Sequence, residues 1–264
     1  MCEKPMAINY KEAMQMVEAA KKYDKLLTIG YQNRYRSDSL YLKKECEKNA
    51  FGEIYFARAK AVRRRAVPTW GVFLNEEEQG GGALIDIGTH ALDLTLWMMD
   101  NYKPKYCVGT TYHKLSNQTQ TANAWGDWNP EEFTVEDSAF GFVVMENGAT
   151  VIIESSWALN TRERGEAKTV LCGDKGGADM NDGLHINGVC NDKQYVTKVQ
   201  LDADGVDFFS GDTISDRELE LRTFVDAVLG KGELTVLPEQ AAAVTRILEG
   251  IYQSAKTGKP VYFD

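Results

Sequence analysis

The sequence of 264 residues lacks the features that mark several classes of protein. Its five cysteines never form a C-x-x-C pair, which argues against a disulfide framework and against a zinc site built on such pairs. No apolar run is long enough to span a membrane, and no signal peptide is visible. We therefore expect a protein of the reducing cytoplasm.

Positive charge is also scarce. The chain has 30 Lys and Arg against 39 Asp and Glu, a net charge of −9. A nucleic-acid binder needs a basic surface to neutralise phosphates, so neither nucleic acid nor an anionic membrane is an expected partner. The single basic run, Arg63-Arg64-Arg65, is more typical of a solvated strand end than of a phosphate site. The 43% hydrophobic and 26% charged content is typical of a globular protein.

The first 36 residues predict part of a parallel α/β unit. Residues 10–23 have helical spacing of apolar side chains, and residues 26–31 form a short apolar run typical of a buried strand. Strand end, helix and strand in this order are the parts of a parallel sheet. Residues 32–36 follow the strand directly, where ligands bind in such sheets.

The rest of the chain predicts a large, mainly antiparallel sheet. In residues 53–63, Tyr55, Ala57, Ala59 and Ala61 alternate on one expected face. Residues 114–136 form a long loop, a length that is often functional. The fold class is α+β. Further strands are expected at 105–113, 139–145, 149–157, 167–172, 184–190, 194–201 and 260–263, and further helices at 38–49 (capped by Ser37), 215–229 and 238–256.

The three glycines at 80–82 open the segment on which the functional interpretation depends. They precede an apolar helix to about residue 100, and glycines at such a place allow a substrate close to backbone N–H groups. Asp86 and His90 are four residues apart, which places both on one helix face. A nearby carboxylate fixes the tautomer of a histidine and raises its basicity. The alternative is a structural Asp beside a buried, hydrogen-bonded His.

Four stretches, in order, resemble motifs of the glucose–fructose oxidoreductase/inositol dehydrogenase (Gfo/Idh/MocA) family. Glu3-Lys4-Pro5 resembles its E-K-P motif, and residues 30–35 resemble the loop after the next strand. Residues 81–93 resemble its G-G-x-x-x-D-x-G-x-H-x-x-D signature, and residues 224–261 resemble its ending. The resemblance covers nearly all of the chain.

The resemblance implies an NAD(P)-dependent oxidoreductase that takes hydride from a hydroxyl-bearing carbon of a sugar or cyclitol. It implies that Lys4, Asp86 and His90 are catalytic. A cation such as Lys4 stabilises a developing alkoxide and depresses the pKa of the histidine. The resemblance also implies a cofactor site formed by Glu3, Lys4, Pro5, Gln32 and Asn33. It implies a substrate site formed by Lys4, Arg34, Trp70, Asp86 and His90. It implies no metal site.

The family usually carries a Rossmann region with a G-x-G-x-x-G loop before the E-K-P motif, and this sequence has no such spacing. We therefore expect residues 1–36 to be the C-terminal remnant of a dinucleotide-binding domain. Residues 37–264 are then an α+β substrate-binding and oligomerisation domain. We expect this chain alone to bind NAD or NADP weakly or not at all. We also expect its first 31 residues to be the part of the chain least protected from hydrogen exchange.

Three other functions stay open at this point. The first is a glycosidase that uses NAD for transient oxidation. The second is a non-catalytic scaffold or oligomerisation protein. The third is a metal hydrolase that uses Asp86 and His90 with His113 or His185. An open sheet usually needs cover on both faces, so a dimer or tetramer of this chain is expected.

Overall fold

The structure is a computed structural model, and it describes residues 1–201 and 214–263. In these residues nine strands form one sheet in the order β10-β9-β8-β7-β3-β6-β5-β4-β11. Among them β3 and β6 are parallel, and the other neighbours are antiparallel. The mainly antiparallel sheet is therefore confirmed. Its strands are β3 (Ile54–Val62), β4 (Pro104–Tyr112), β5 (Ser138–Met145), β6 (Thr150–Ser156), β7 (Gly165–Gly173), β8 (Gly176–Asp179), β9 (His185–Cys190), β10 (Lys193–Lys198) and β11 (Val261–Tyr262).

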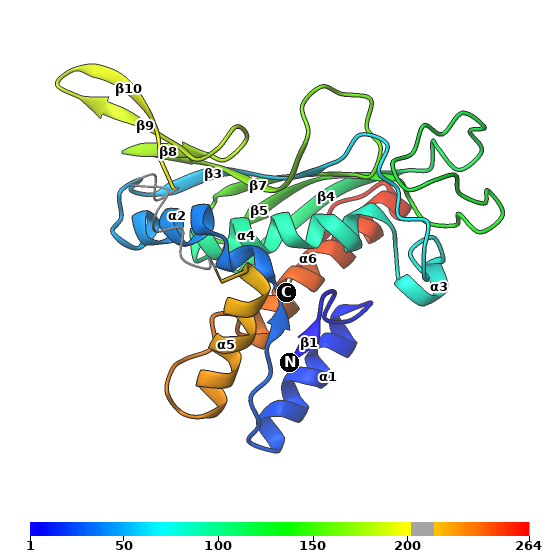
Figure 1. The fold of residues 1–264 in the computed structure, drawn as a ribbon, viewed down its shortest axis with the longest axis horizontal. Helices are drawn as coiled ribbons and strands as arrows, with labels where there is room; N and C mark the ends of the chain where they lie inside the picture. The colour runs from blue at the N-terminus through cyan, green and yellow to red at the C-terminus, as the bar shows by residue number, and fades with distance from the viewer. Residues whose placement is uncertain (202–213, 264) are drawn as a thin grey trace.

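Helices cover one face of the sheet (Figure 1). These are α2 (Ser37–Glu47), α4 (Thr89–Met99) and α6 (Pro238–Thr257). Helix α6 lies directly on β4 and β5 because Gly109 and Gly141 leave room for Ile251. A Cβ atom at either glycine would come within 2.6 Å of that side chain. Gly258 ends α6 with a φ of +67°, a left-handed conformation that glycine adopts without strain.

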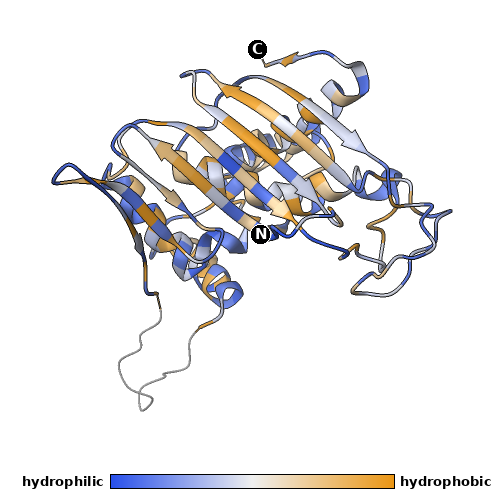
Figure 2. Ribbon diagram, turned by 90° about the horizontal axis from the view of Figure 1, so that it is seen from above, coloured by the Kyte–Doolittle hydropathy of each residue, from blue (hydrophilic) through white to orange (hydrophobic). Residues whose placement is uncertain are grey.

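The opposite face of the sheet is open (Figure 2). One row of paired residues crosses it from β4 to β7: Val108, Phe142, Ile152, Arg58 and Val170. Val108 is 39% exposed and Phe142 is 43% exposed. Apolar side chains on a sheet face are normally covered. This face therefore has the character of a contact surface.

The N-terminal residues form a small parallel unit beyond the helical layer (Figure 1). Strand β1 (Cys2–Glu3) pairs in parallel with β2 (Ile29–Gly30), and α1 (Tyr10–Lys22) connects them. The Asn9 side chain caps α1 by accepting a hydrogen bond from the Glu12 N–H at 2.9 Å. The predicted order of strand end, helix and strand is confirmed, although β2 is shorter than residues 26–31.

Two short helical elements complete this region. The 3₁₀ helix η1 (Gln32–Tyr35) follows β2, and α5 (Asp216–Val228) packs against it. The Ser215 hydroxyl caps α5 by accepting from the Glu218 N–H at 3.2 Å, so the helix predicted over residues 215–229 is confirmed. At α2, by contrast, Arg36 is the capping position and Ser37 is already helical.

The predicted face of β3 needs one correction. Ala57, Ala59 and Ala61 are buried under the helices, whereas Tyr55 is 56% exposed. The pairing of β3 with β7 is irregular between Ile54 and Phe56. Such a bulge shifts the alternation of faces, so Tyr55 does not share the buried face.

Candidate active site

The candidate catalytic segment begins with a π-helical turn, η2 (Leu84–Gly88), which continues into α4. The glycines before it allow protein groups, rather than a ligand, to come close. A Cβ atom at Gly82 would lie 1.9 Å from the backbone oxygen of Glu136, and one at Gly81 would lie 2.3 Å from the Tyr252 hydroxyl. We expected these glycines to let a substrate approach the backbone, but at Gly81 and Gly82 the space is filled by protein atoms. π turns are frequent at functional sites.

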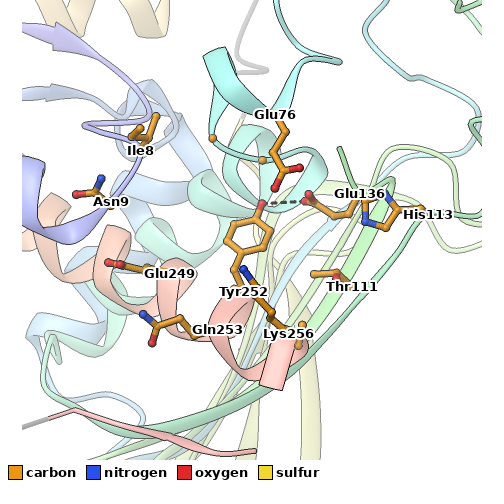
Figure 3. Close-up of a pocket in the computed structure, with 13 residues that line it drawn as sticks. Ile8, Asn9, Glu76, Thr111, His113, Glu136, Glu249, Tyr252, Gln253 and Lys256 are labelled. Atoms are coloured by element: carbon orange, nitrogen blue, oxygen red, sulfur yellow. Dashed lines mark hydrogen bonds between the residues drawn. The ribbon is translucent and has the colours of Figure 1, made fainter. Parts of the chain in front are cut away.

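The carboxylate of Glu136 holds the start of this turn. It accepts hydrogen bonds from the N–H groups of Gly82 at 2.7 Å and Leu84 at 2.9 Å. The Tyr252 hydroxyl of α6 donates a third at 2.9 Å (Figure 3). Burial raises the pKa of Glu136, and the backbone hydrogen bonds oppose that rise. Sequence reasoning did not identify Glu136, because nothing in its local sequence marks it.

Asp86 accepts hydrogen bonds from two other segments and forms an ion pair with a third. The Lys4 Nζ donates to its Oδ1 at 2.9 Å and to its backbone oxygen at 2.8 Å. The Trp157 indole donates to Oδ2 at 2.8 Å, and the Arg63 Nη1 lies 3.9 Å from the same oxygen. Asp86 is 5% exposed. The structure thus brings Lys4 and Asp86 into one ion pair.

Arg63 and Trp157 reach Asp86 because β3 and β6 are parallel. Val62 at the end of β3 is opposite Ser156 at the end of β6. The residues that follow, Arg63 and Trp157, therefore lie at the same end of the sheet. Neither residue was expected in the site, although Arg63 begins the basic run.

His90 is 6% exposed and lies beside the Tyr31 ring, edge to face, with centroids 6.1 Å apart. Its Nδ1 is buried and has no hydrogen-bond partner within the described part of the chain. Burial, followed by the Lys4 and Arg63 cations, lowers the pKa of His90 to about 3. The imidazole is therefore neutral near pH 7.

This environment corrects one expectation and supports another. Asp86 was expected to raise the basicity of His90, but both oxygens of its carboxylate face Lys4, Trp157 and Arg63. The net effect on the pKa is a decrease. The depression by Lys4 was expected, and it is present.

Arg34 lies in the interior rather than at a ligand surface. It forms two hydrogen bonds with the buried carboxylate of Asp93, at 2.6 and 2.9 Å. Its Nη1 also donates to the Thr235 backbone and to Gln240, both at 2.8 Å. With 0% exposure the guanidinium is not available to a substrate, which does not fit the predicted substrate contact. It ties η1 to α4 and to the start of α6.

The residues predicted to bind the cofactor gather at one end of the small parallel unit. Glu3, Lys4 and Pro5 occupy or follow the end of β1, and Gln32 and Asn33 follow β2. Because Glu3 pairs with Gly30 in a parallel register, both segments leave the sheet at the same edge. Gln32 and Asn33 are half-buried.

Trp70 is connected to Asp86 through two other side chains. It is 51% exposed, and it lies edge to face against Trp125 with centroids 5.0 Å apart. The Trp125 ring lies 5.3 Å from the Arg63 guanidinium carbon, and Arg63 approaches Asp86. The long loop of residues 114–136 therefore reaches the site through Trp125.

The other two histidines belong to other elements than His90. His113 lines a hollow of about 480 Å³ with Glu136 and Tyr252 (Figure 3), and His185 is on β9. The described residues contain no group of three or more His, Cys, Asp or Glu side chains placed to hold a metal ion. They also include no helix that is both long and apolar enough to cross a membrane.

Comparison with known proteins gives consistent results. The family model described as GFO/IDH/MocA C-terminal domain matches residues 39–179. The chain is 35% identical to the D-glucoside 3-dehydrogenase of Escherichia coli K12 over 264 residues, which are 99% of this chain and 71% of that protein.

Solved structures of low sequence identity share the fold. An oxidoreductase domain protein from Kribbella flavida has a TM-score of 0.84 at 18% identity, covering 100% of this chain and 73% of that one. A levoglucosan dehydrogenase in complex with NADH and L-sorbose has a TM-score of 0.82 at 18% identity, covering 100% of this chain and 72% of that one.

Proposed function

The chain belongs to the Gfo/Idh/MocA family of oxidoreductases, and we propose that the group of Lys4, Asp86 and His90 oxidises a hydroxyl-bearing carbon of a sugar. The observation that carries this proposal is the Lys4–Asp86 ion pair beside a neutral, buried imidazole. The NAD(P)-dependent sugar dehydrogenase chemistry follows from the family and from relatives that act on glucosides or bind NADH. A secondary hydroxyl of a glucoside or a cyclitol is the proposed target.

The cofactor is NAD or NADP. When bound, its nicotinamide ring accepts the hydride. We assign its contacts to Glu3, Lys4, Pro5, Gln32 and Asn33, because the ends of adjacent parallel strands are where such cofactors bind.

His90 and Lys4 divide the proton chemistry. Because Nδ1 is the buried nitrogen of His90, we assign acceptance of the hydroxyl proton to Nε2. The Lys4 ammonium stabilises the negative charge that develops on the substrate oxygen. Asp86 positions Lys4 through the hydrogen bond of 2.9 Å, and Trp157 fixes the other oxygen of Asp86. The site therefore combines an acceptor for the proton with a cation for the oxygen.

Absorbance of NADH at 340 nm tests this function. The chain is assayed at millimolar NAD⁺ or NADP⁺ with a panel of glucosides and cyclitols. H90N and K4M are expected to lose about a hundredfold or more of the turnover found with the best substrate. R222A, a change on the exposed α5, is the control for expression and folding. Equal turnover in H90N and wild type contradicts the assignment, and release of nitrophenol from an aryl glucoside favours a glycosidase instead.

The domain division remains a proposal: residues 1–36 serve the dinucleotide, and residues 37–264 serve the substrate and oligomerisation. A second copy of this chain is the proposed cover for the open sheet face, because Val108 and Phe142 are apolar neighbours on that face and both are exposed. F142E is expected to halve the mass measured by light scattering, and an unchanged mass contradicts this interface. Five free cysteines support a reducing cytoplasm.

A further inference from the structure

A basic hollow adjoins the candidate active site. Two segments form most of its wall, residues 62–66 at the end of β3 and residues 162–166 at the start of β7. The antiparallel pairing of β3 with β7 brings them together, since Val62 is opposite Gly165. The hollow is open to solvent and has a volume of about 620 Å³. Four arginines line it: Arg63, Arg64, Arg162 and Arg164.

The positive charge of this basic hollow is not balanced by its own acidic residue. Glu166, which also lines it, is taken by Arg63 through hydrogen bonds of 2.7 and 2.5 Å. Within the described residues, Arg64, Arg162 and Arg164 form no ion pair with an acidic side chain. Three guanidinium groups therefore share one hollow in a chain whose net charge is −9. All three side chains are exposed, so an anion that enters the hollow can contact several guanidinium groups at once.

The basic hollow and the catalytic group share Arg63. Its Nη1 lies 3.9 Å from the Asp86 Oδ2, and its guanidinium also lines the hollow. The Trp125 ring, 5.3 Å from that guanidinium, lines the same hollow. A sugar held against Lys4 and Asp86 can therefore extend an acidic substituent past Arg63 toward the other arginines.

We propose that this basic hollow binds an anionic group of the substrate, a phosphate or a carboxylate carried by the sugar. The inference rests on the proposed function, because it specifies the substrate class of the same site. Guanidinium groups present paired N–H donors that match the oxygens of both anions. Arg162 and Arg164 are the residues that distinguish an acidic sugar from a neutral one.

Calorimetric titration of the chain at low salt tests this inference with glucose, glucose 6-phosphate, glucuronate and inorganic phosphate. We expect at least one anionic sugar to bind about tenfold or more tightly than glucose, and added salt to weaken that preference. A preference for glucose 6-phosphate, with binding of inorganic phosphate, identifies the phosphate. A preference for glucuronate identifies the carboxylate.

Two variants locate the effect. R162A/R164A is expected to lose the anion preference, whereas R222A on α5, where Arg222 pairs with Glu218, is expected to keep it. Equal binding of glucose and both anionic sugars, absence of binding of either anion, or an unchanged preference in R162A/R164A overturns the inference. Titration measures binding and not turnover, so the anion preference can be interpreted even if the dehydrogenase assay fails. Turnover of neutral glucosides without anion preference overturns the anion site alone.

Discussion

Acid should destabilise this protein through His90. Burial and the nearby Lys4 and Arg63 cations lower the pKa of His90 from its usual 6.5 to about 3, whereas in the unfolded chain the imidazole titrates near 6.5. Between these two values the unfolded state binds more protons than the folded state. The free energy of unfolding therefore falls as the pH falls through this window.

The size of the effect follows from the two pKa values. Relative to neutral pH, His90 should account for a loss of about 2 kcal/mol at pH 5, and for a loss that approaches about 5 kcal/mol below pH 3. The loss at pH 5 depends mainly on the pKa of the unfolded chain, because the folded imidazole is still neutral there. It is a large share of a typical stability of about 5–15 kcal/mol.

The free energy of unfolding of wild type and of H90N is measured by urea unfolding, followed by tryptophan fluorescence, at about pH 7.5 and about pH 5. Carboxylates elsewhere also titrate, but they do so in both proteins. Because Asn does not titrate, wild type should lose about 2 kcal/mol more than H90N between these pH values.

Removing the charge of Lys4 provides a second comparison. K4M should raise the pKa of His90 and so reduce the extra loss below about pH 4, where the folded imidazole titrates, whereas K22M, at the exposed end of α1, should not. If wild type and H90N lose equal stability at pH 5, the imidazole is not held neutral in the way that its burial beside Lys4 and Arg63 implies.

Three further predictions concern the packing around the site and the cofactor. E136Q places an amide N–H group where the N–H of Gly82 or Leu84 donates to the carboxylate. The free energy of unfolding measured in urea should therefore fall by about 2 kcal/mol, and kcat should fall as well. The control E146Q, in an exposed turn, should stay within about 0.5 kcal/mol of wild type. R34M leaves the buried carboxylate of Asp93 unpaired and should cost about 3–5 kcal/mol in the same assay; a cost below 1 kcal/mol contradicts the role of this ion pair. Because the 264 residues contain no G-x-G-x-x-G loop, calorimetric titration should give an NADH affinity weaker than micromolar, and a micromolar value contradicts this.

Local signals made much of the fold predictable. The helices at α1 and α6 were found because their apolar spacing coincides with clear ends, such as Pro238 and Gly258. Strands β5 and β6 match the strands predicted at residues 139–145 and 149–157. Strand β8 was missed because Gly176–Asp179 has no apolar alternation. The exposure of Tyr55 was missed because a bulge depends on the partner strand.

The candidate site was predictable only in part, since most of its contacts join distant segments. Lys4 and Asp86 were proposed from motifs, and they are 82 positions apart in an ion pair of 2.9 Å. No local sequence pattern identifies Trp157 or Glu136 as site residues, because their partners are determined by strand pairing and by helix packing. The direction of the pKa shift of His90 depends on burial and on which groups occupy Asp86. Neither is visible in a four-residue spacing.

The parallel pairing of β3 with β6 has an evolutionary consequence. Both strands end beside Asp86, which Arg63 and Trp157 contact, and the later parts of the connections, residues 69–75 and 160–164, run over the surface before the chain re-enters regular structure. Such connections can be lengthened or rewritten without disturbing a single rung of the sheet. Descendants of one ancestral scaffold can thus acquire new substrate preferences while the lysine, the aspartate and the imidazole stay where they are.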